Sequence, residues 1–151
     1  MAETTFRIIS SGWIRHYKHH SISLKFLKMD YKELLAFKKG FELAMNIFYV
    51  SKNFPKEERY SLTDQIRRSS RSVCASIAES YRKRIYPAHF KSKLSDADME
   101  NSETSVWLDF AHACEYLSDE TYFELTQKSN EVGKLINYMI FNPSKFGVSS
   151  K

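Results

Sequence analysis

Residues 61–84, SLTDQIRRSSRSVCASIAESYRKR, are the stretch that most constrains how this chain can fold. When these residues are placed on an α-helix, they form three different faces. The apolar face, interrupted by Ser70, is Leu62, Ile66, Val73, Ile77 and Tyr81. A second face has only small side chains, at Ser69, Ser72, Ser76 and Ser80, and the rest of the surface is strongly basic. A helix with a core face, a close-contact face and a charged face is expected inside an assembly of helices.

Three further helices are predicted around this one, over residues 31–53, 88–117 and 119–142. Asp30 followed by Glu33 is a capping box that starts the first helix. Asn53-Phe54-Pro55 ends it, since the residue before proline avoids the helical region. Tyr86-Pro87 separates the second and third helices, and Ser118 is a suitable N-cap for the fourth. Short connections make neighbouring helices antiparallel, so we expect an all-α, up-down-up-down four-helix bundle.

Each flanking helix has an apolar stripe that is expected to face the core. In the first, the stripe is Leu34, Phe37, Phe41, Ala44 and Phe48, broadened by Leu43, Ile47 and Val50. In the third, it is Phe90, Leu94, Ala97, Thr104, Leu108 and Ala111, extended by Trp107, Phe110, Cys114 and Leu117. In the fourth, it is Leu125, Val132, Ile136 and Met139. Gly40 within the first helix is expected to mark a place of close packing.

The bundle is expected to form one domain over residues 30–143. Residues 1–29 show no sustained period and are expected to be a basic, flexible extension, while residues 144–151 are expected to fray. No apolar run approaches the ~18 residues that a membrane span needs, and the start lacks an export signal. With two cysteines and no metal-ligand spacing, a reducing, cytoplasmic location is predicted.

Charge is divided sharply along the chain. Residues 1–29 hold five Lys or Arg and one Glu, which is +4 of the total of +5. Residues 56–93 hold ten basic and four acidic residues, or +6, whereas residues 94–131 hold one basic and ten acidic residues, or −9. Such polarity fits either an external polyanion or internal pairing between adjacent helices.

The basic residues fall into two candidate groups. Those in the middle of the second helix, Arg67, Arg68 and Arg71, are level with Glu100 and Glu103 across the predicted helical hairpin. For these we favour structural ion pairs over contacts with phosphate. The second group lies at the end of the bundle, at Arg82, Lys83, Arg84, Lys91 and Lys93. These residues are the better candidates for phosphate contacts, although a solvated charged end explains them equally well.

No pattern in the chain is typical of catalysis. Asp109-x-x-His112 puts a carboxylate and an imidazole on one helical face, but a di-metal bundle site needs two Glu-x-x-His motifs and two further Glu residues. The serines of residues 69–76 have no His or Lys partner in a recognisable nucleophile arrangement. A glycine-rich phosphate loop is missing as well. We therefore expect a protein that is not an enzyme and that uses no cofactor and no metal.

The chain resembles a known bacterial family in the run FPKEERYSLTDQIRRSSRSVCASIAESYRKR and in HFKSKLSDADMENSETSVWLDFA. The family is that of the 23S rRNA intervening-sequence proteins, and the resemblance covers roughly residues 31–141. Its most specific parts are Phe54-Pro55, Glu58-Arg59-Tyr60, the segment 65–68, Ile77-Ala78-Glu79, and Glu103 with Trp107-Leu108. Ser76 and Ser80 depart from the family pattern, which often has Asn and Gly at these positions.

The resemblance implies a four-helix bundle without enzymatic activity. The family is similar to the accessory variability protein of diversity-generating retroelements, which forms positively charged pentamers and works with a reverse transcriptase and RNA. This similarity implies a homo-oligomer, with five as the expected number, and RNA, DNA and a reverse transcriptase as possible partners. We therefore expect a nucleic-acid-associated accessory factor. The alternative is a protein-interaction scaffold that binds no nucleic acid and whose charges are used in its own contacts.

Overall fold

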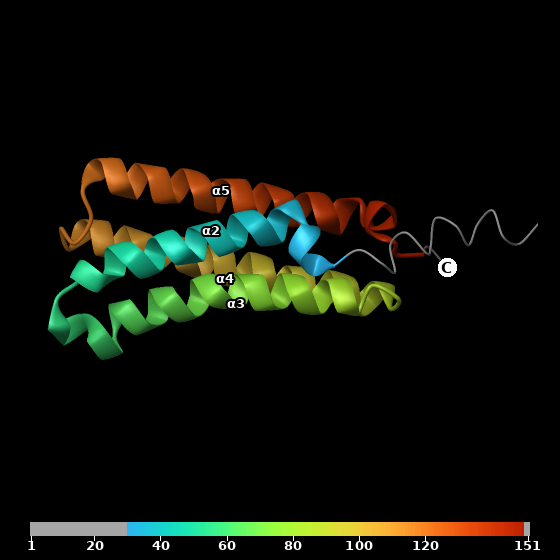
Figure 1. The fold of residues 1–151 in the computed structure, drawn as a ribbon, viewed down its shortest axis with the longest axis horizontal. Helices are drawn as coiled ribbons and strands as arrows, with labels where there is room; N and C mark the ends of the chain where they lie inside the picture. The colour runs from blue at the N-terminus through green and yellow to red at the C-terminus, as the bar shows by residue number, and fades with distance from the viewer. Residues whose placement is uncertain (1–29, 150–151) are drawn as a thin grey trace, which may run out of the picture.

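The computed structural model describes residues 30–149, which fold into four long helices (Figure 1). These are α2 (Leu35–Val50), α3 (Leu62–Arg82), α4 (Pro87–Ala113) and α5 (Asp119–Phe141). Successive helices run in opposite directions, which confirms the all-α, up-down-up-down bundle expected from the sequence. None of these helices is long and apolar enough to cross a membrane. The expectation of a flexible extension over residues 1–29 lies outside the described residues.

Three of the predicted apolar stripes form the core. On α3, Leu62 and Tyr81 are buried together with Ile66, Val73 and Ile77 between them. The α4 stripe from Phe90 to Ala111 and the α5 stripe from Leu125 to Met139 are buried in the same way. The hydrophobic spacing therefore identified these main stripes correctly, but in the predicted extension of the α4 stripe Phe110 is 54% exposed and Trp107 is only partly buried.

The inward face of α2 was predicted only in part: Leu34, Leu43, Ala44 and Ile47 of the predicted face are buried, whereas its aromatic residues are not. The buried residues of α2 are three small ones, Ala36, Gly40 and Ala44, and two aliphatic ones, Leu43 and Ile47. Phe41, expected in the core, is 54% exposed, whereas Phe37 and Phe48 are only partly buried. The prediction was wrong for these aromatic residues because they recur with the same helical period as the residues of the core. A Cβ on Gly40 would lie 3.4 Å from Cys74 Sγ, so this glycine does mark a close approach of α2 to α3.

Polar side chains in the middle of the bundle are hydrogen-bonded to one another. Thr104 Oγ1 of α4 donates to Ser69 Oγ of α3 at 2.9 Å, and both residues are fully buried. Asn101 Nδ2 donates to the carbonyl oxygen of Ser129 on α5 at 3.0 Å. Because buried polar groups are costly when unpaired, these bonds fix how α3, α4 and α5 align along their length.

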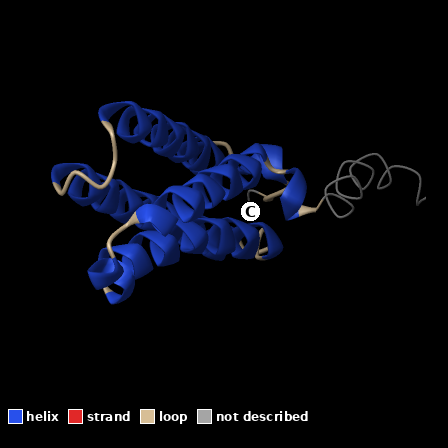
Figure 2. Cartoon of the chain, turned by 60° about the vertical axis from the view of Figure 1, so that its left-hand side comes forward, coloured by secondary structure: helices blue, strands red, loops and turns tan. Residues whose placement is uncertain are grey.

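The connection between α2 and α3 consists of two short 3-10 helices, η2 (Ser51–Asn53) and η3 (Lys56–Tyr60), in place of a direct start of the next helix (Figure 2). Phe54 between them is buried against the ring of Tyr116 at 5.7 Å. Glu58 then caps α3, since its Oε2 accepts the backbone N–H of Leu62 at 3.2 Å and the hydroxyl of Ser61. The α-helix therefore begins at Leu62, several residues after Pro55.

The end of α4 and the C-terminal segment both differ from expectation. α4 stops at Ala113, short of residue 117, because Glu115 adopts a left-handed conformation with φ of 60°. Cys114, expected in the core, is consequently exposed. The segment expected to fray from residue 144 is folded up to the last described residue. It contains η4 (Pro143–Phe146), and Val148 is buried in the core.

We predict that Glu58→Gln lowers stability at neutral pH and has little effect in acid. Hydrogen bonds from Ser61 and from the backbone of Leu62 hold the pKa of Glu58 below its ordinary value of 4.5. A lowered carboxyl pKa contributes stability above the ordinary value, and this contribution is lost as pH falls through the folded-state pKa. Urea unfolding midpoints at pH 7 and about pH 3 should therefore show a deficit only at pH 7.

The neighbouring carboxylate of Glu57 provides a control, since no hydrogen bond or ion pair to another described residue holds its side chain. Glu57→Gln should leave the midpoint nearly unchanged at both pH values. An equal deficit for Glu58→Gln at pH 7 and pH 3 would show that the ionised cap does not contribute as described.

Candidate nucleic-acid interface

A cavity of about 980 Å³ opens at the junction of α2 and α3 and is surrounded by positive charge. We call it the basic groove and define it by its six cationic residues, Lys52, Lys56, Arg59, Arg67, Arg68 and Arg71. Asp64 is the one acidic residue in its lining. On α3, the small side chains of Ser72 and Ala75 also line the cavity.

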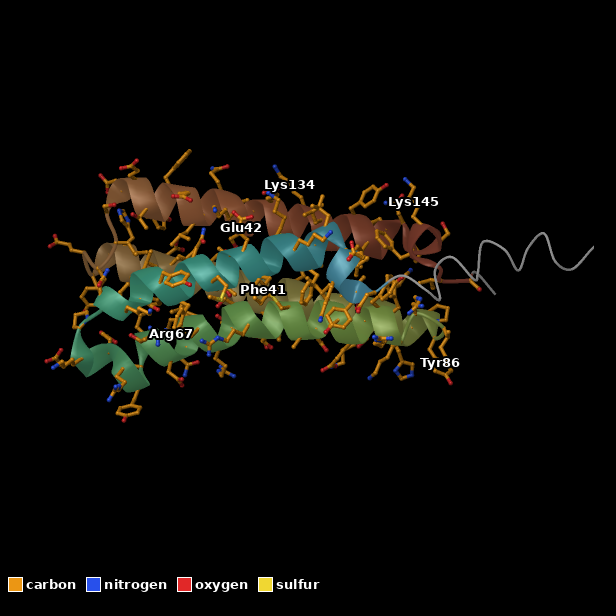
Figure 3. The ribbon with its side chains drawn as sticks, in the orientation of Figure 1. Phe41, Glu42, Arg67, Tyr86, Lys134 and Lys145 are labelled. Atoms are coloured by element: carbon orange, nitrogen blue, oxygen red, sulfur yellow. The ribbon has the colours of Figure 1, made fainter. Side chains whose placement is uncertain are left out.

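Two segments of the chain bring these cations together. The connection between α2 and α3 supplies Lys52, Lys56 and Arg59, because Phe54 and Pro55 turn it back alongside α3. α3 itself supplies Arg67 and Arg71, which are four residues apart and so lie on one side of the helix. Figure 3 shows Arg67 between α2 and α3, toward the end of the bundle where the two helices are connected.

Phe48 and Ser51 hold the arginines of α3 toward α2. Arg67 Nε donates to Ser51 Oγ at 2.7 Å, and its guanidinium lies 5.0 Å from the centre of the Phe48 ring. The guanidinium of Arg71 is 5.8 Å from the same ring, and Lys52 Nζ is 4.8 Å from it. Cations over an aromatic face are attracted by its quadrupole. Phe48, which we expected in the core, thus serves as a platform for three groove cations.

The expected ion pairs across the α3–α4 hairpin form in only one of their combinations. Arg68 Nη2 lies 3.4 Å from Glu103 Oε1, which also accepts a hydrogen bond from Trp107 Nε1 at 3.1 Å. Arg67 and Arg71 have no carboxylate oxygen within 4.0 Å among the described residues, because they face α2 and not α4. Glu100 pairs with none of the three arginines, and no described residue donates a hydrogen bond to its shielded Oε2.

The cluster predicted at the bundle end is weaker than the sequence suggested. Arg84 is buried, donates to the carbonyl oxygen of Tyr81 at 2.6 Å and lies 4.1 Å over the Tyr81 ring. Lys93 Nζ lies 3.0 Å from Glu79 and 3.2 Å from Asp96, and hydrogen bonds to these carboxylates raise its pKa. Exposed cations remain at Arg82, Lys83 and Lys91. Tyr86 marks this end of the bundle in Figure 3, far from Arg67.

Sequence reasoning missed the contribution of Lys52, Lys56 and Arg59. Their spacing follows no helical period, since they lie in a connection that changes direction at Pro55. The sequence did contain a feature that could have located them. The basic residues lie around Pro55, shortly before a helix with arginines at positions 67 and 71. That combination places two short basic segments on the two sides of one turn.

We predict that Arg68→Gln destabilises the protein by less than about 1 kcal/mol, since the pair with Glu103 is exposed. The side chain of Arg68 is 60% exposed and that of Glu103 is 32% exposed. Urea unfolding of Arg68→Gln, Glu103→Gln and the double variant gives the coupling between the two residues. A coupling of several kcal/mol would mean that the pair is buried in the functional assembly.

The comparisons with known proteins agree on the family. The family described as 23S rRNA-intervening sequence protein matches residues 32–138, which include the whole basic groove. A crystal structure from Bacteroides thetaiotaomicron VPI-5482, described as a protein with unknown function from the S23 ribosomal protein family, is similar with a TM-score of 0.65. The two chains are 30% identical, over 71% of this chain and 96% of that one. The comparison with curated proteins found no match. The chain belongs to the 23S rRNA-intervening sequence protein family.

Proposed function

We propose that this protein is a non-enzymatic, oligomeric accessory factor that binds the backbone of RNA or DNA through the basic groove. One observation carries the proposal. Five groove cations converge on a single recess, and none has a carboxylate oxygen within 4.0 Å among the described residues. These are Lys52, Lys56, Arg59, Arg67 and Arg71. The sixth groove cation, Arg68, is paired with Glu103, and other ion-paired cations lie away from the groove, at Lys39, Lys93 and Lys128.

Such a recess suits phosphate chemically. Guanidinium groups donate to phosphate oxygens in a planar, two-bond geometry, and ammonium groups act as compact point charges. Their neutralisation of backbone phosphates releases condensed counterions, which gives affinity that depends on salt and little on sequence. The description of the family refers to 23S rRNA, so RNA is the first polyanion to test.

The absence of catalysis is part of the proposal. Burial raises the pKa of the Cys74 thiol to about 11, so this group stays protonated near neutral pH. A protonated thiol is a poor nucleophile. His112, whose Nε2 lies 2.8 Å from Asp119 Oδ1, stacks on Tyr122 at 4.2 Å between ring centres. These contacts join the end of α4 to α5 and leave His112 with a structural role.

Self-assembly is supported by the number of large apolar side chains on the surface. They occur on three helices, at Leu35, Phe41, Val106, Phe110 and Phe123, each at least 47% exposed. Contiguous exposed apolar surface is typical of interaction sites. Symmetric association would repeat the basic groove in each subunit and raise avidity for a long polyanion without new kinds of contact.

We predict that the groove contributes more to nucleic-acid affinity than the bundle end does. The test compares Lys56→Gln/Arg59→Gln/Arg71→Gln with Arg82→Gln/Lys83→Gln/Lys91→Gln in the full chain. Each variant loses three exposed positive charges, so both keep the same net charge and the same residues 1–29. In filter binding to mixed-sequence RNA, the groove variant should bind more weakly. Its log–log salt slope should flatten by up to about 2, at ~0.7 per lost single-strand contact.

Two other outcomes decide against this proposal. If the bundle-end variant shows the larger loss, the phosphate site is the cluster that the sequence first indicated. If the unaltered protein binds neither RNA nor DNA at low salt, the protein-interaction scaffold becomes the better explanation. Equal unfolding midpoints of the two variants would ensure that neither result comes from misfolding.

We also predict that the full chain is a closed homo-oligomer in solution at micromolar concentration. Light scattering should give a multiple of the 17.8 kDa chain mass, with five subunits expected from the resemblance to the retroelement accessory proteins. Phe110→Asp should lower this mass if α4 forms part of the contact, because burying a charge in an apolar contact is unfavourable. A monomeric mass for the unaltered protein would contradict the prediction.

A further inference from the structure

Tyr60, the residue after Arg59 of the basic groove, is a large aromatic side chain that takes no part in the packing of the bundle. It is 87% exposed, the highest value among the large hydrophobic residues of the described chain. No described residue stacks on its ring or forms a hydrogen bond with its hydroxyl. It directly follows Arg59 of the groove at the end of η3. The chain thus presents an exposed aromatic ring one residue after a cation of the groove.

A second exposed ring lies at the α2 side of the same groove. Tyr49 is 58% exposed, and Lys52 Nζ of the groove lies 5.1 Å from the centre of its ring. Tyr49 also contacts Phe48 edge to face at 5.5 Å, which restricts its orientation. Tyr49 and Tyr60 come from the two segments that flank the groove cations, one from α2 and the other from η3.

The backbone that carries Tyr60 is well anchored. Glu58 Oε1 accepts a hydrogen bond from the Tyr116 hydroxyl at 3.3 Å, and Glu58 Oε2 caps α3. The backbone N–H of Ser61 donates to the carbonyl oxygen of Glu58 at 3.2 Å, which closes the turn around Tyr60. Phe54 fixes the start of this segment in the core. The ring is therefore exposed on a rigid segment, so little conformational freedom is lost when a ligand stacks on it.

We infer that the basic groove takes single-stranded nucleic acid, with an unpaired base stacked on Tyr60. This inference rests on the proposed function and adds the strand type and a contact with the base. In a duplex the flat faces of the bases are stacked on one another, so an aromatic side chain at the surface cannot reach them. A single strand offers a base face next to each phosphate, and aromatic rings beside a basic groove are the usual platform for it.

The test measures binding of the full chain to one RNA oligonucleotide without self-complementarity, alone and annealed to its complement. Tyr60→Ala should weaken binding to the single strand about tenfold, within the range typical of lost base stacking, and should change duplex binding less than about twofold. Tyr60→Phe keeps the ring and should bind the single strand like the unaltered protein. Phe141→Ala, which removes a 79% exposed ring from the end of α5, is the matched control and should have no effect.

The outcomes separate this inference from the proposed function. If Tyr60→Ala binds the single strand normally while the groove charge variant remains weak, base stacking is wrong and backbone binding stands. If Tyr60→Ala lowers affinity for both strand types equally, the strand preference is wrong. If it changes the mass by light scattering, the ring contacts a second copy of the chain, and the inference is overturned. If the unaltered protein binds neither strand type, the proposed function itself fails.

Discussion

The close approach of neighbouring helices to α3 determines the rest of the structure. Ser69 and Ser80 of α3 are fully buried, and Gly40 of α2 lies against Cys74. Larger side chains at these positions would separate the helices and leave voids in the core. With these small residues turned inward, the rotation of α3 about its axis is set. Arg68 then faces α4, whereas Arg67 and Arg71 face the connection from α2, so the packing of the core determines which cations remain unpaired.

The connection between α2 and α3 gives the recess its shape. Phe54 attaches the connection to the core, and Glu58 joins it to the first turn of α3 and to Tyr116. Without these anchors, Lys56 and Arg59 would lie on a mobile loop, and ordering that loop would oppose phosphate binding. The small side chains of Ser72 and Ala75 also line the cavity. Packing, capping and the basic groove therefore depend on the same short segment.

Much of the bundle followed from hydrophobic spacing, but the candidate site did not. The stripes of α3, α4 and α5 were identified because apolar and polar residues separate cleanly around each helix. On α2 the aromatic residues recur with the same period as the core residues, so Phe41 was placed in the core together with Leu43, although only Leu43 is buried. Helical period also cannot locate Lys56 or Arg59, whose positions depend on the turn at Pro55. The burial of Arg84 depends on Tyr81, a contact within one turn that charge counting does not detect.

Ion pairs between α2 and α5 account for part of the division of charge along the sequence. Lys128 Nζ lies 2.6 Å from Glu42 Oε1, and Lys39 Nζ lies 3.3 Å from Glu131 Oε2, so acidic groups of α5 and α2 are partly neutralised between these two helices. The hydrogen bond from Lys128 lowers the pKa of Glu42, as expected for a carboxylate held beside an ammonium group. Arg67 and Arg71 take no part in these ion pairs. Positive charge that no described carboxylate pairs with therefore remains at the groove on the α3 side, which is the surface that the proposed function assigns to an external polyanion.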